Sequence, residues 1–430
     1  MMKAPALLFN PLDPIFRADP YPFYARLRAE DPVHETPAGV YVLSRYAGCV
    51  AALRDPRLSS DLRHTEAFRK ATDPPAARPP SRRGRAGRGA IDAQARLPDR
   101  QGEALRRTPP FLVLDPPDHT RLRGLVSKAF TPRAVEAMRP RIEALVNELL
   151  DTAATHGEVE FVEEFAYPLP LTVICEMLGV PAEDHAVFKE WSRALSRGLD
   201  PPEVQPPDAL ERQREAGNAF AQYFRDLITR RRSRPAADLL SDLIEVEEQG
   251  DRLTEDELVS TCIFLLAAGH ETTVNLLSGG LLALLRHPDQ LALLRNDQSL
   301  ARGAVEELLR YDAPVQYAVR VAREDVDVGV RTIAAGRQVL ALLGSANRDP
   351  DAFPDPDRLD ITRRDNRHIA FGFGIHFCLG APLARIEGET AFRALVSRFR
   401  RIELLTEAPE YKENITLRGL RSLRVALSLA

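Results

Sequence analysis

The sequence predicts a mainly α-helical protein with a small β region, the α+β class, and three observations support this. Apolar residues recur at helical spacing through most of the stretch from about residue 111 to about residue 287. Strand-like alternation of apolar and polar residues occurs in short segments such as VRVAREDVDVGV (319–330) and SLRVALSLA (422–430). No internal repeat or linker divides the chain, so residues 1–430 are expected to form one domain.

The N-terminal part predicts a mixture of short elements followed by a loop. A helix is expected at YPFYARLRAE (21–30), two short strands around GVYVLSRY (39–46), and a second helix that ends near Asp55. Residues 69–107 are rich in Pro, Arg, Gly and Ala, with eleven Lys or Arg against four Asp or Glu. Such a composition cannot bury enough apolar surface to order a core, so it predicts a long basic loop.

Helices dominate the middle of the chain. One begins after the two prolines of DPPDHTRLR (115–123), and others follow with breaks near residues 157, 180, 200 and 235. The proline-rich LDPPEVQPPD (199–208) is expected to end one helix of an antiparallel pair whose loop gates a pocket. The longest helix begins with the capping box Thr254 and Glu257 and continues to about residue 286, a length of roughly 50 Å.

Composition excludes several classes of protein. The chain has 44% hydrophobic and 28% charged residues and a net charge of −4, which is typical of a globular protein and gives no case for nucleic-acid binding. The longest apolar run near the N-terminus, residues 6–9, is too short for a signal sequence or a membrane span. We therefore expect a cytoplasmic protein without a membrane anchor.

One cysteine stands in an unusual setting. Cys378 lies in FGFGIHFCLG (371–380), surrounded by Gly372, Gly374 and Gly380. A cysteine among apolar residues is most often a small buried hydrophobic residue, but the glycines suggest a tight loop whose backbone closely approaches another group. Helical spacing resumes just after Gly380, and a helix N-terminus stabilises a thiolate. The position predicts a lowered pKa for Cys378 and a metal ligand.

The choice of metal follows from the other cysteines. Cys49, Cys175 and Cys262 are scattered singly, without the paired spacing of a zinc site, an iron–sulfur cluster or a disulfide framework. A lone thiolate suits a metal whose remaining ligands come from a macrocycle, which indicates haem iron.

Three groups of charged or polar residues accompany this cysteine. Polar residues 270–273 interrupt the apolar run IFLLAAGHETTVNLL (263–277), and they form either an inter-helix polar network or a proton relay. His119 and Arg123 are four residues apart on one helix face, where they either point to solvent or share an anion. Glu307 and Arg310 are three apart and can form an ion pair.

The segment FGFGIHFCLG resembles the haem-binding loop of the cytochrome P-450 superfamily, the haem-thiolate monooxygenases, with Phe371, Gly374, Cys378 and Gly380 at pattern positions. Because the N-terminus shows no anchor, the resemblance is to the soluble bacterial type. It implies the fold of that family, with haem b (iron protoporphyrin IX) held by Cys378 between the long central helix and the helix after the cysteine loop.

The resemblance also implies roles for individual residues. Glu271 and Thr272 match the acid and alcohol of the family's proton relay, while Ala268 and Gly269 make room for dioxygen. Haem contacts are implied for His119, Arg123, Arg320, Phe371, Gly372, His376 and Gly380, with His119, Arg123, Arg320 and His376 at the propionates. Glu307 and Arg310 match a structural pair, with Arg348 expected as the third partner. The implied substrate pocket comprises Ala267, His270, Val315, Tyr317, Val319 and Leu420. His270 either orients a substrate oxygen or turns away into a water network.

The function implied is hydroxylation or epoxidation of a mid-sized apolar molecule of polyketide, terpenoid, steroid or fatty-acid type. Electrons are expected from NAD(P)H through ferredoxin and its reductase, because the chain contains neither a dinucleotide fingerprint nor a ferredoxin cysteine run. The alternatives are a peroxide-driven hydroxylase and a haem protein that binds or senses a ligand without turnover.

A monomer is expected. The basic loop 69–107 is expected to lie over the substrate entrance, either as a tether or as a lid that attracts anionic substrates.

Overall fold

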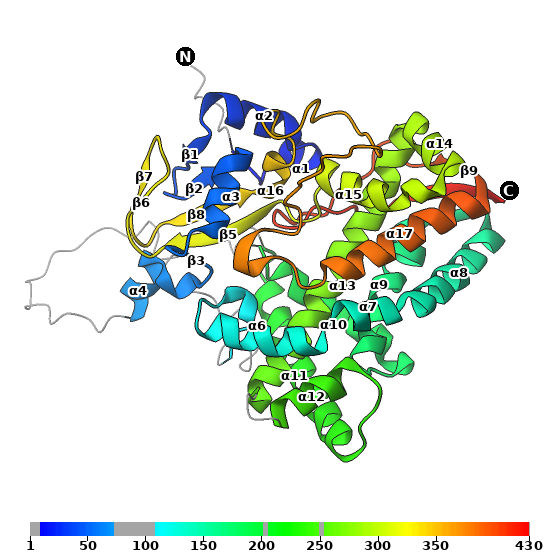
Figure 1. The fold of residues 1–430 in the computed structure, drawn as a ribbon, viewed down its shortest axis with the longest axis horizontal. Helices are drawn as coiled ribbons and strands as arrows, with labels where there is room; N and C mark the ends of the chain where they lie inside the picture. Colours follow the sequence, from blue (N-terminus) through cyan, green and yellow to red (C-terminus); the bar gives the residue numbers. More distant parts are fainter. Residues whose placement is uncertain (1–8, 73–107, 201–204, 249–252, 430) are drawn as a thin grey trace, which may run out of the picture.

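The fold consists of a large helical body with its largest sheet on one side and strand β9 on the other, near the C-terminus (Figure 1). The computed structural model describes residues 9–72, 108–200, 205–248 and 253–429. Of the predicted basic loop, residues 69–72 belong to a helix, and residues 73–107 lie outside the described part of the chain. The lid hypothesis rests on those residues and stays a prediction.

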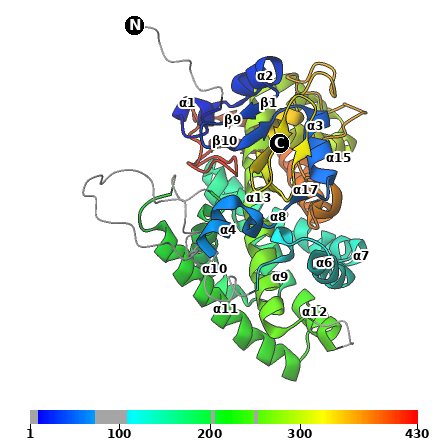
Figure 2. The same ribbon diagram turned by 90° about the vertical axis from the view of Figure 1, so that its left-hand side faces the viewer.

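The helices agree with the expected positions, including the breaks near residues 157, 180, 200 and 235. In the described residues they are α1 Pro14–Ala18, α2 Tyr21–Glu30, α3 Tyr46–Arg54, α4 Glu66–Thr72, α6 Asp118–Ala129, α7 Pro132–Ala137, α8 Arg139–His156, α9 Pro168–Met177, α10 His185–Arg197, α11 Ala209–Ser233, α12 Leu239–Glu248, α13 Glu255–Arg286, α14 Pro288–Asn296, α15 Ala301–Tyr311, α16 Leu343–Ala346 and α17 Ala381–Arg398. Helices α10, α11 and α12 lie at the end of the molecule away from the sheets (Figure 2).

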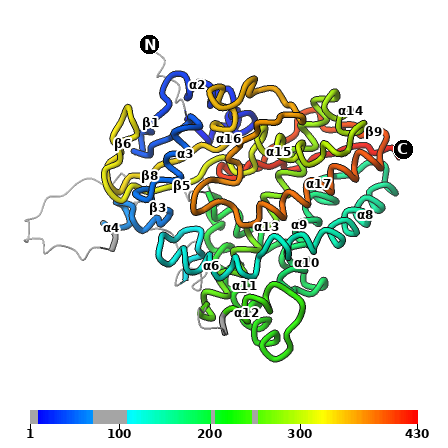
Figure 3. The backbone as a smooth tube through the Cα atoms, viewed as in Figure 1, coloured from blue at the N-terminus to red at the C-terminus, as the bar shows by residue number. Residues whose placement is uncertain are grey.

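The strands form small sheets built from distant parts of the chain. They are β1 Val33–Glu35, β2 Tyr41–Leu43, β3 Leu58–Ser59, β4 Glu158–Glu160, β5 Tyr317–Ala322, β6 Val326–Asp327, β7 Thr332–Ile333, β8 Gln338–Leu342, β9 Phe399–Leu404 and β10 Arg424–Leu429. The largest sheet has the order β1-β2-β8-β5-β3, so the N-terminal strands lie beside strands near residue 320 (Figure 3). A second sheet has the order β4-β10-β9, and β6 pairs with β7.

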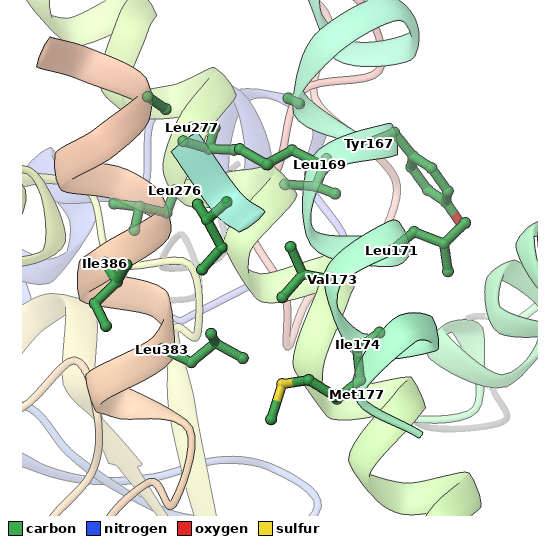
Figure 4. Packing of buried hydrophobic residues seen from close by; sticks show 14 of the residues in the cluster. Tyr167, Leu169, Leu171, Val173, Ile174, Met177, Leu276, Leu277, Leu383 and Ile386 are labelled. Carbon is green, nitrogen blue, oxygen red and sulfur yellow. The ribbon is translucent and has the colours of Figure 1, made fainter. Parts of the chain in front are cut away.

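The central helix α13 organises the body. It begins with the predicted capping box, in which the Thr254 hydroxyl accepts from the Glu257 amide and the Glu257 carboxylate accepts from the Thr254 amide. Most of its side chains are buried, and leucines of α13 pack between α9 and α17 (Figure 4). Long apolar burial of this kind is the main stabilising contribution in a fold of this size.

A buried ion pair within α15 also contacts the long segment before the cysteine loop. Arg310 donates two hydrogen bonds of 2.8 Å to Glu307, and both side chains are fully buried. The prediction that Arg348 is the third partner of this pair is wrong. Arg348 instead donates to the Tyr311 carbonyl and to Asp357, whereas Arg363 bonds Glu307 at 3.1 Å. Arg363 reaches Glu307 because its segment wraps around the end of α15, a long-range contact that spacing along the chain does not reveal.

We expect Glu307→Ala to destabilise the fold by about 3 to 5 kcal/mol, because it leaves Arg310 buried without its carboxylate. Urea unfolding followed by circular dichroism measures this change. The control is Glu30→Ala, which breaks the exposed Arg26–Glu30 pair and should change stability by less than about 0.5 kcal/mol. Equal effects of the two substitutions would contradict the structural role of Glu307.

Candidate active site

The cysteine loop is a tight turn that ends at the N-terminus of α17. Gly372 and Gly374 have φ values of +72° and +73°, a region that side chains disfavour, and a Cβ at Gly374 would lie 2.6 Å from the Leu53 carbonyl oxygen. The Cys378 amide donates to the Phe371 carbonyl at 2.9 Å, which closes the loop. The glycines therefore let the loop fold back on itself and lie against the end of α3.

Cys378 differs from the other three cysteines because it is accessible to solvent, whereas they are buried. Crowding by protein atoms raises the pKa of Cys378 above its usual value, although the amides of Gly380 and Ala381 and the Arg123 guanidinium lower it. The prediction of a lowered pKa is wrong in net direction, because the helix N-terminus opposes the desolvation without overcoming it.

Contacts between α13 and α17 show which part of α13 the cysteine loop faces. A Cβ at Gly280 would lie 2.7 Å from Phe392, and a Cβ at Gly388 would lie 3.4 Å from Leu276. The α17 residue that faces Thr273 lies further toward the N-terminus, at Glu387. The chain therefore runs in the same direction along the two helices. The loop before α17 consequently lies toward the part of α13 that precedes Thr273.

That part of α13 has an accessible stripe. Ala268 is exposed and Phe264 and Thr272 are half-buried, although most of their neighbours are buried. Residues four apart share a helix face, so Phe264, Ala268 and Thr272 lie on one face of α13. Thr272 Oγ1 donates to the Ala268 carbonyl at 3.0 Å. Gly269 faces elsewhere, because a Cβ there would lie 3.3 Å from Ile174 of α9.

Two arginine and two histidine side chains from three regions of the sequence gather near the cysteine loop. The ring centroids of His119 and His376 are 4.3 Å apart, and Arg123 donates to the Phe377 carbonyl at 2.5 Å. Arg320 lies close enough to lower the pKa of both histidines. This brings together from three regions of the sequence the residues predicted to contact propionates.

The electrostatics of this cluster indicate a site for an anion. Burial lowers the pKa of Arg320 to about 10, and burial with the neighbouring cations lowers that of His376 to about 3. Within the described residues, both ring nitrogens of His119 and Nδ1 of His376 lack hydrogen-bond partners. Buried donors that repel one another are satisfied by a ligand with negative charge. The cluster therefore offers donors that fit the two carboxylates of a haem.

The predicted acid and alcohol lie side by side on α13 in different environments. Glu271 is buried and accepts a hydrogen bond of 2.5 Å from Lys412 Nζ. Burial raises the pKa of Glu271, but Lys412 and His270 lower it more, so it lies below its usual value. Glu271 is therefore a carboxylate at neutral pH. Thr272 is half-buried beside it on the accessible stripe.

The two predicted pocket residues of β5 point away from the face of the strand that carries Arg320. Neighbouring residues of a strand point to opposite faces, so Tyr317 and Val319 lie on the face opposite Arg320. They pack there in the N-terminal apolar cluster that contains Phe16 and Tyr24. Strand alternation thus places Tyr317 and Val319 away from Arg320, and their assignment to a substrate pocket stays a prediction.

The other predicted pocket residues are placed as follows. Ala267 is half-buried beside the accessible stripe, and Val315 packs partly against the second apolar cluster. Leu420 is fully buried in the main core. His270 is also fully buried, with Nδ1 2.9 Å from the Leu266 carbonyl and Nε2 3.4 Å from the Tyr167 hydroxyl. Of the two alternatives for His270, the structure has its ring turned into a polar cluster.

Two polar residues near the relay were not predicted. Lys412 is 141 positions from Glu271 in the sequence, so no local spacing points to it. Glu387 lies on the core face of α17, where burial raises its pKa to about 8 although the nearby Thr273 lowers it. A carboxyl group with that pKa carries a proton at neutral pH. An acidic residue at an apolar position of the α17 pattern was the available signal for Glu387.

The fold and the site together define a helical haem-thiolate protein. The family model described as "Cytochrome P450" matches residues 100–420. The chain therefore belongs to the cytochrome P450 family, which binds haem b, and it is an oxidoreductase that incorporates molecular oxygen.

Relatives and solved structures agree with this assignment. The chain is 43% identical over 419 residues to vitamin D(3) 25-hydroxylase of Pseudonocardia autotrophica, and the match covers 96% of this chain and 94% of the relative. It is 47% identical over 316 residues to 6-deoxyerythronolide B hydroxylase of Saccharopolyspora erythraea, with coverage of 73% and 76%. The structure of the cytochrome P450 PksS of Bacillus subtilis matches with a TM-score of 0.84, 39% identity and coverage of 98% and 100%. Within the described residues, the helices include none with the length and apolar character needed to cross a membrane.

We expect Cys378→His to abolish the thiolate absorption band of the reduced carbon monoxide complex, from which the family takes its name, because the imidazole is a neutral ligand. Absorption spectroscopy of the haem-loaded protein measures this. Cys262→Ser is the control, because Cys262 is fully buried in the core and should leave the band unchanged. A normal thiolate band in the Cys378 variant would exclude the assignment.

Proposed function

We propose that the protein hydroxylates or epoxidises a mid-sized apolar substrate of polyketide, terpenoid, steroid or fatty-acid type, with electrons from NAD(P)H through ferredoxin and its reductase. The observation that carries this proposal is the accessible stripe of α13, which lies toward the cysteine loop and ends in an acid and an alcohol. The chain itself offers an oxygen-activating site but no dinucleotide fingerprint.

In this proposal the haem, bound through Cys378 Sγ, supplies the activation of dioxygen and the transfer of one oxygen atom. The guanidinium groups of Arg123 and Arg320 and the ring N–H groups of His119 and His376 would hold its carboxylates and so fix its orientation. Phe371, Gly372 and Gly380 shape the loop on the cysteine side. Ala268 is exposed on α13, and its small side chain would leave space there for dioxygen.

Proton delivery is the task of the residues on α13. Reduction of dioxygen with cleavage of its O–O bond consumes protons, and the Thr272 hydroxyl can donate one from the accessible stripe. Glu271 is ionised and buried beside it, so it can accept a proton from outside and pass it on. Glu387 faces the neighbouring Thr273, and its carboxyl group, which is protonated at neutral pH, can supply the one proton that it carries.

The intact acid and alcohol pair argues against the peroxide-driven alternative, because a peroxide-using site does not need the same proton supply. A haem protein that binds a ligand without turnover remains distinguishable by experiment. Aerobic product formation by the reduced protein separates it from the monooxygenase proposed here.

The substrate class can be tested with three molecules that the similar proteins suggest by name or type: vitamin D(3), 6-deoxyerythronolide B and a fatty acid such as myristic acid. A substrate that displaces iron-bound water shifts the haem absorption spectrum, so titration of each molecule measures binding. Product analysis with a ferredoxin and its reductase then measures turnover. No shift with any apolar molecule of these classes would argue against the proposed substrate range.

We expect Thr272→Ala to reduce product formation by about 100-fold or more, because general acid–base steps contribute about 100- to 10,000-fold. Haem binding and substrate binding should stay largely intact, while reducing equivalents appear as hydrogen peroxide. The measurement is the ratio of product and peroxide to NAD(P)H consumed. Unchanged coupling would exclude the assigned role of Thr272.

The proposed ferredoxin docks on the cysteine-loop side, where α6 exposes Arg121 and Lys128 (Figure 1). Arg121 also binds Glu257, which holds its side chain along the surface. We expect the double substitution Arg121→Glu and Lys128→Glu to slow the first electron transfer and to weaken its dependence on ionic strength. Stopped-flow reduction measures both. Arg400→Glu with Arg401→Glu, in β9 after the far end of α17, is the control with the same charge change. An effect of equal size in the control would place docking elsewhere.

A further inference from the structure

A cluster of three charged or titratable side chains adjoins the start of the cysteine loop. It consists of Glu306 of α15, Arg385 of α17 and His368, which precedes the loop by three residues. Arg385 donates two hydrogen bonds to the Glu306 carboxylate, from Nε at 2.6 Å and from Nη2 at 3.0 Å. Burial raises the pKa of Glu306, but hydrogen bonds from His368 and Arg385 lower it more, to about 2. Glu306 is therefore a carboxylate at neutral pH.

The imidazole of His368 is fixed in one orientation. Its Nδ1 accepts a hydrogen bond of 3.2 Å from the Ala370 amide, so that nitrogen carries no hydrogen. The ring hydrogen therefore lies on Nε2, which donates to Glu306 Oε2 at 3.0 Å. The His368 side chain is only 3% exposed, so this bond is sheltered from water. His368 thus holds in place the carboxylate that binds Arg385.

This anchoring places the guanidinium group of Arg385 over an aromatic ring of the cysteine loop. Its central carbon lies 4.7 Å from the centroid of the Phe371 ring, within the range of a cation–π contact. The carbonyl of Phe371 in turn accepts the hydrogen bond of the Cys378 amide. Although burial raises the pKa of Cys378, Arg385 is one of the groups that lower it. The positive charge of Arg385 therefore acts on the sulfur across the loop.

A positive charge near a thiolate changes how strongly the sulfur donates electrons to a bound metal. The charge stabilises electron density on the sulfur, so less is donated to iron and the reduced state is easier to reach. Arg123 also acts on Cys378, but it belongs to the cluster that fits the carboxylates of a haem. Arg385 is instead paired with a carboxylate of the protein, so its orientation depends on this chain alone.

We propose that Arg385 is a positioning residue that raises the reduction potential of the haem iron by weakening electron donation from the Cys378 thiolate. Glu306 and His368 fix its guanidinium group over Phe371, and the negative charge of Glu306 offsets part of its effect. The step affected is the one-electron reduction of ferric to ferrous iron, for which the proposed ferredoxin supplies the electron. This inference rests on the proposed ligation by Cys378 and adds a residue that sets the donor strength of the ligand.

Redox titration of the haem-loaded protein, followed by its absorption spectrum, tests the proposal without a substrate. We expect Arg385→Met to lower the equilibrium constant for reduction by about threefold or more, which is roughly 28 mV for one electron. Arg385→Gln should shift the potential in the same direction, and it keeps a hydrogen-bond donor for Glu306 should the methionine variant fail to bind haem. Arg385→Lys keeps the charge and should stay closer to the wild-type potential than either variant. A lysine variant whose potential falls as far as that of Arg385→Met would overturn the proposal.

Glu306→Gln should have the opposite effect, which a purely structural role does not predict. It removes the negative partner, so the net charge over Phe371 becomes more positive and the potential should rise. The controls are Arg393→Met and Glu143→Gln, which break an ion pair of similar exposure further along α17 and should leave the potential unchanged. Shifts in the same direction for Arg385→Met and Glu306→Gln, or no shift in one of them, would overturn the proposal. Controls that shift as much would overturn it as well.

The iron–sulfur stretching frequency, measured by resonance Raman spectroscopy, gives a second measure of electron donation. It should rise in Arg385→Met and fall in Glu306→Gln, because a stronger donor makes a stronger bond to iron. Unchanged frequencies in both variants would contradict the proposed effect on the thiolate.

Failure of this inference differs from failure of the assignments on which it rests. If Cys378 is not the ligand, the thiolate band of the reduced carbon monoxide complex survives in Cys378→His. If only the inference is wrong, that variant loses the band, while the Arg385 and Glu306 variants keep both the band and the wild-type potential. Absence of product from every apolar molecule tested would refute the proposed function and would leave these potentials as they are.

Discussion

The close packing of α17 on α13 is the constraint on which the site depends. A Cβ at Gly280 would lie 2.7 Å from Phe392 of α17, and a Cβ at Gly388 would lie 3.0 Å from Val305 of α15 and 3.4 Å from Leu276 of α13, so the glycines favour the close register seen here. That register sets the cysteine loop toward the accessible stripe of α13. Interiors are packed like crystals, and a shift of one helix against the other would displace the ligand from the residues that act with it.

Charge is distributed unevenly around this framework. On the cysteine side, two arginines and two histidines lie together with lowered pKa values, and the carboxylates of the proposed haem would supply negative charge there. On the far side of α13, Glu271 is a buried carboxylate whose positive partner is supplied by the protein. Within the described residues, the arginines and histidines thus lack a negative ion-pair partner, whereas the buried carboxylate of Glu271 has a positive one. Both require partners from distant parts of the sequence, because a charge in a poorly solvated place needs compensation.

Sequence patterns predicted features that depend on neighbouring residues. The capping box at Thr254 and Glu257, the tight loop around Cys378, and the ion pair of Glu307 with Arg310 each follow from residues within a few positions of one another. Features that depend on distant contacts were missed or wrong. Arg348 was expected beside Glu307, but Arg363 is there, because the path of the segment after α16 decides which arginine reaches the carboxylate.

By itself the sequence determined the mainly helical class, the capping box of the central helix and the glycine-rich loop around Cys378, because short-range periodicity and local residue chemistry encode these properties. Only the tertiary structure decided the electrostatic state of the site. The pKa of Cys378 depends on how many atoms crowd its sulfur, and that of Glu271 depends on Lys412, a residue 141 positions away. Desolvation and Coulomb interactions act through space, so folding brings together groups whose coupling no local pattern records.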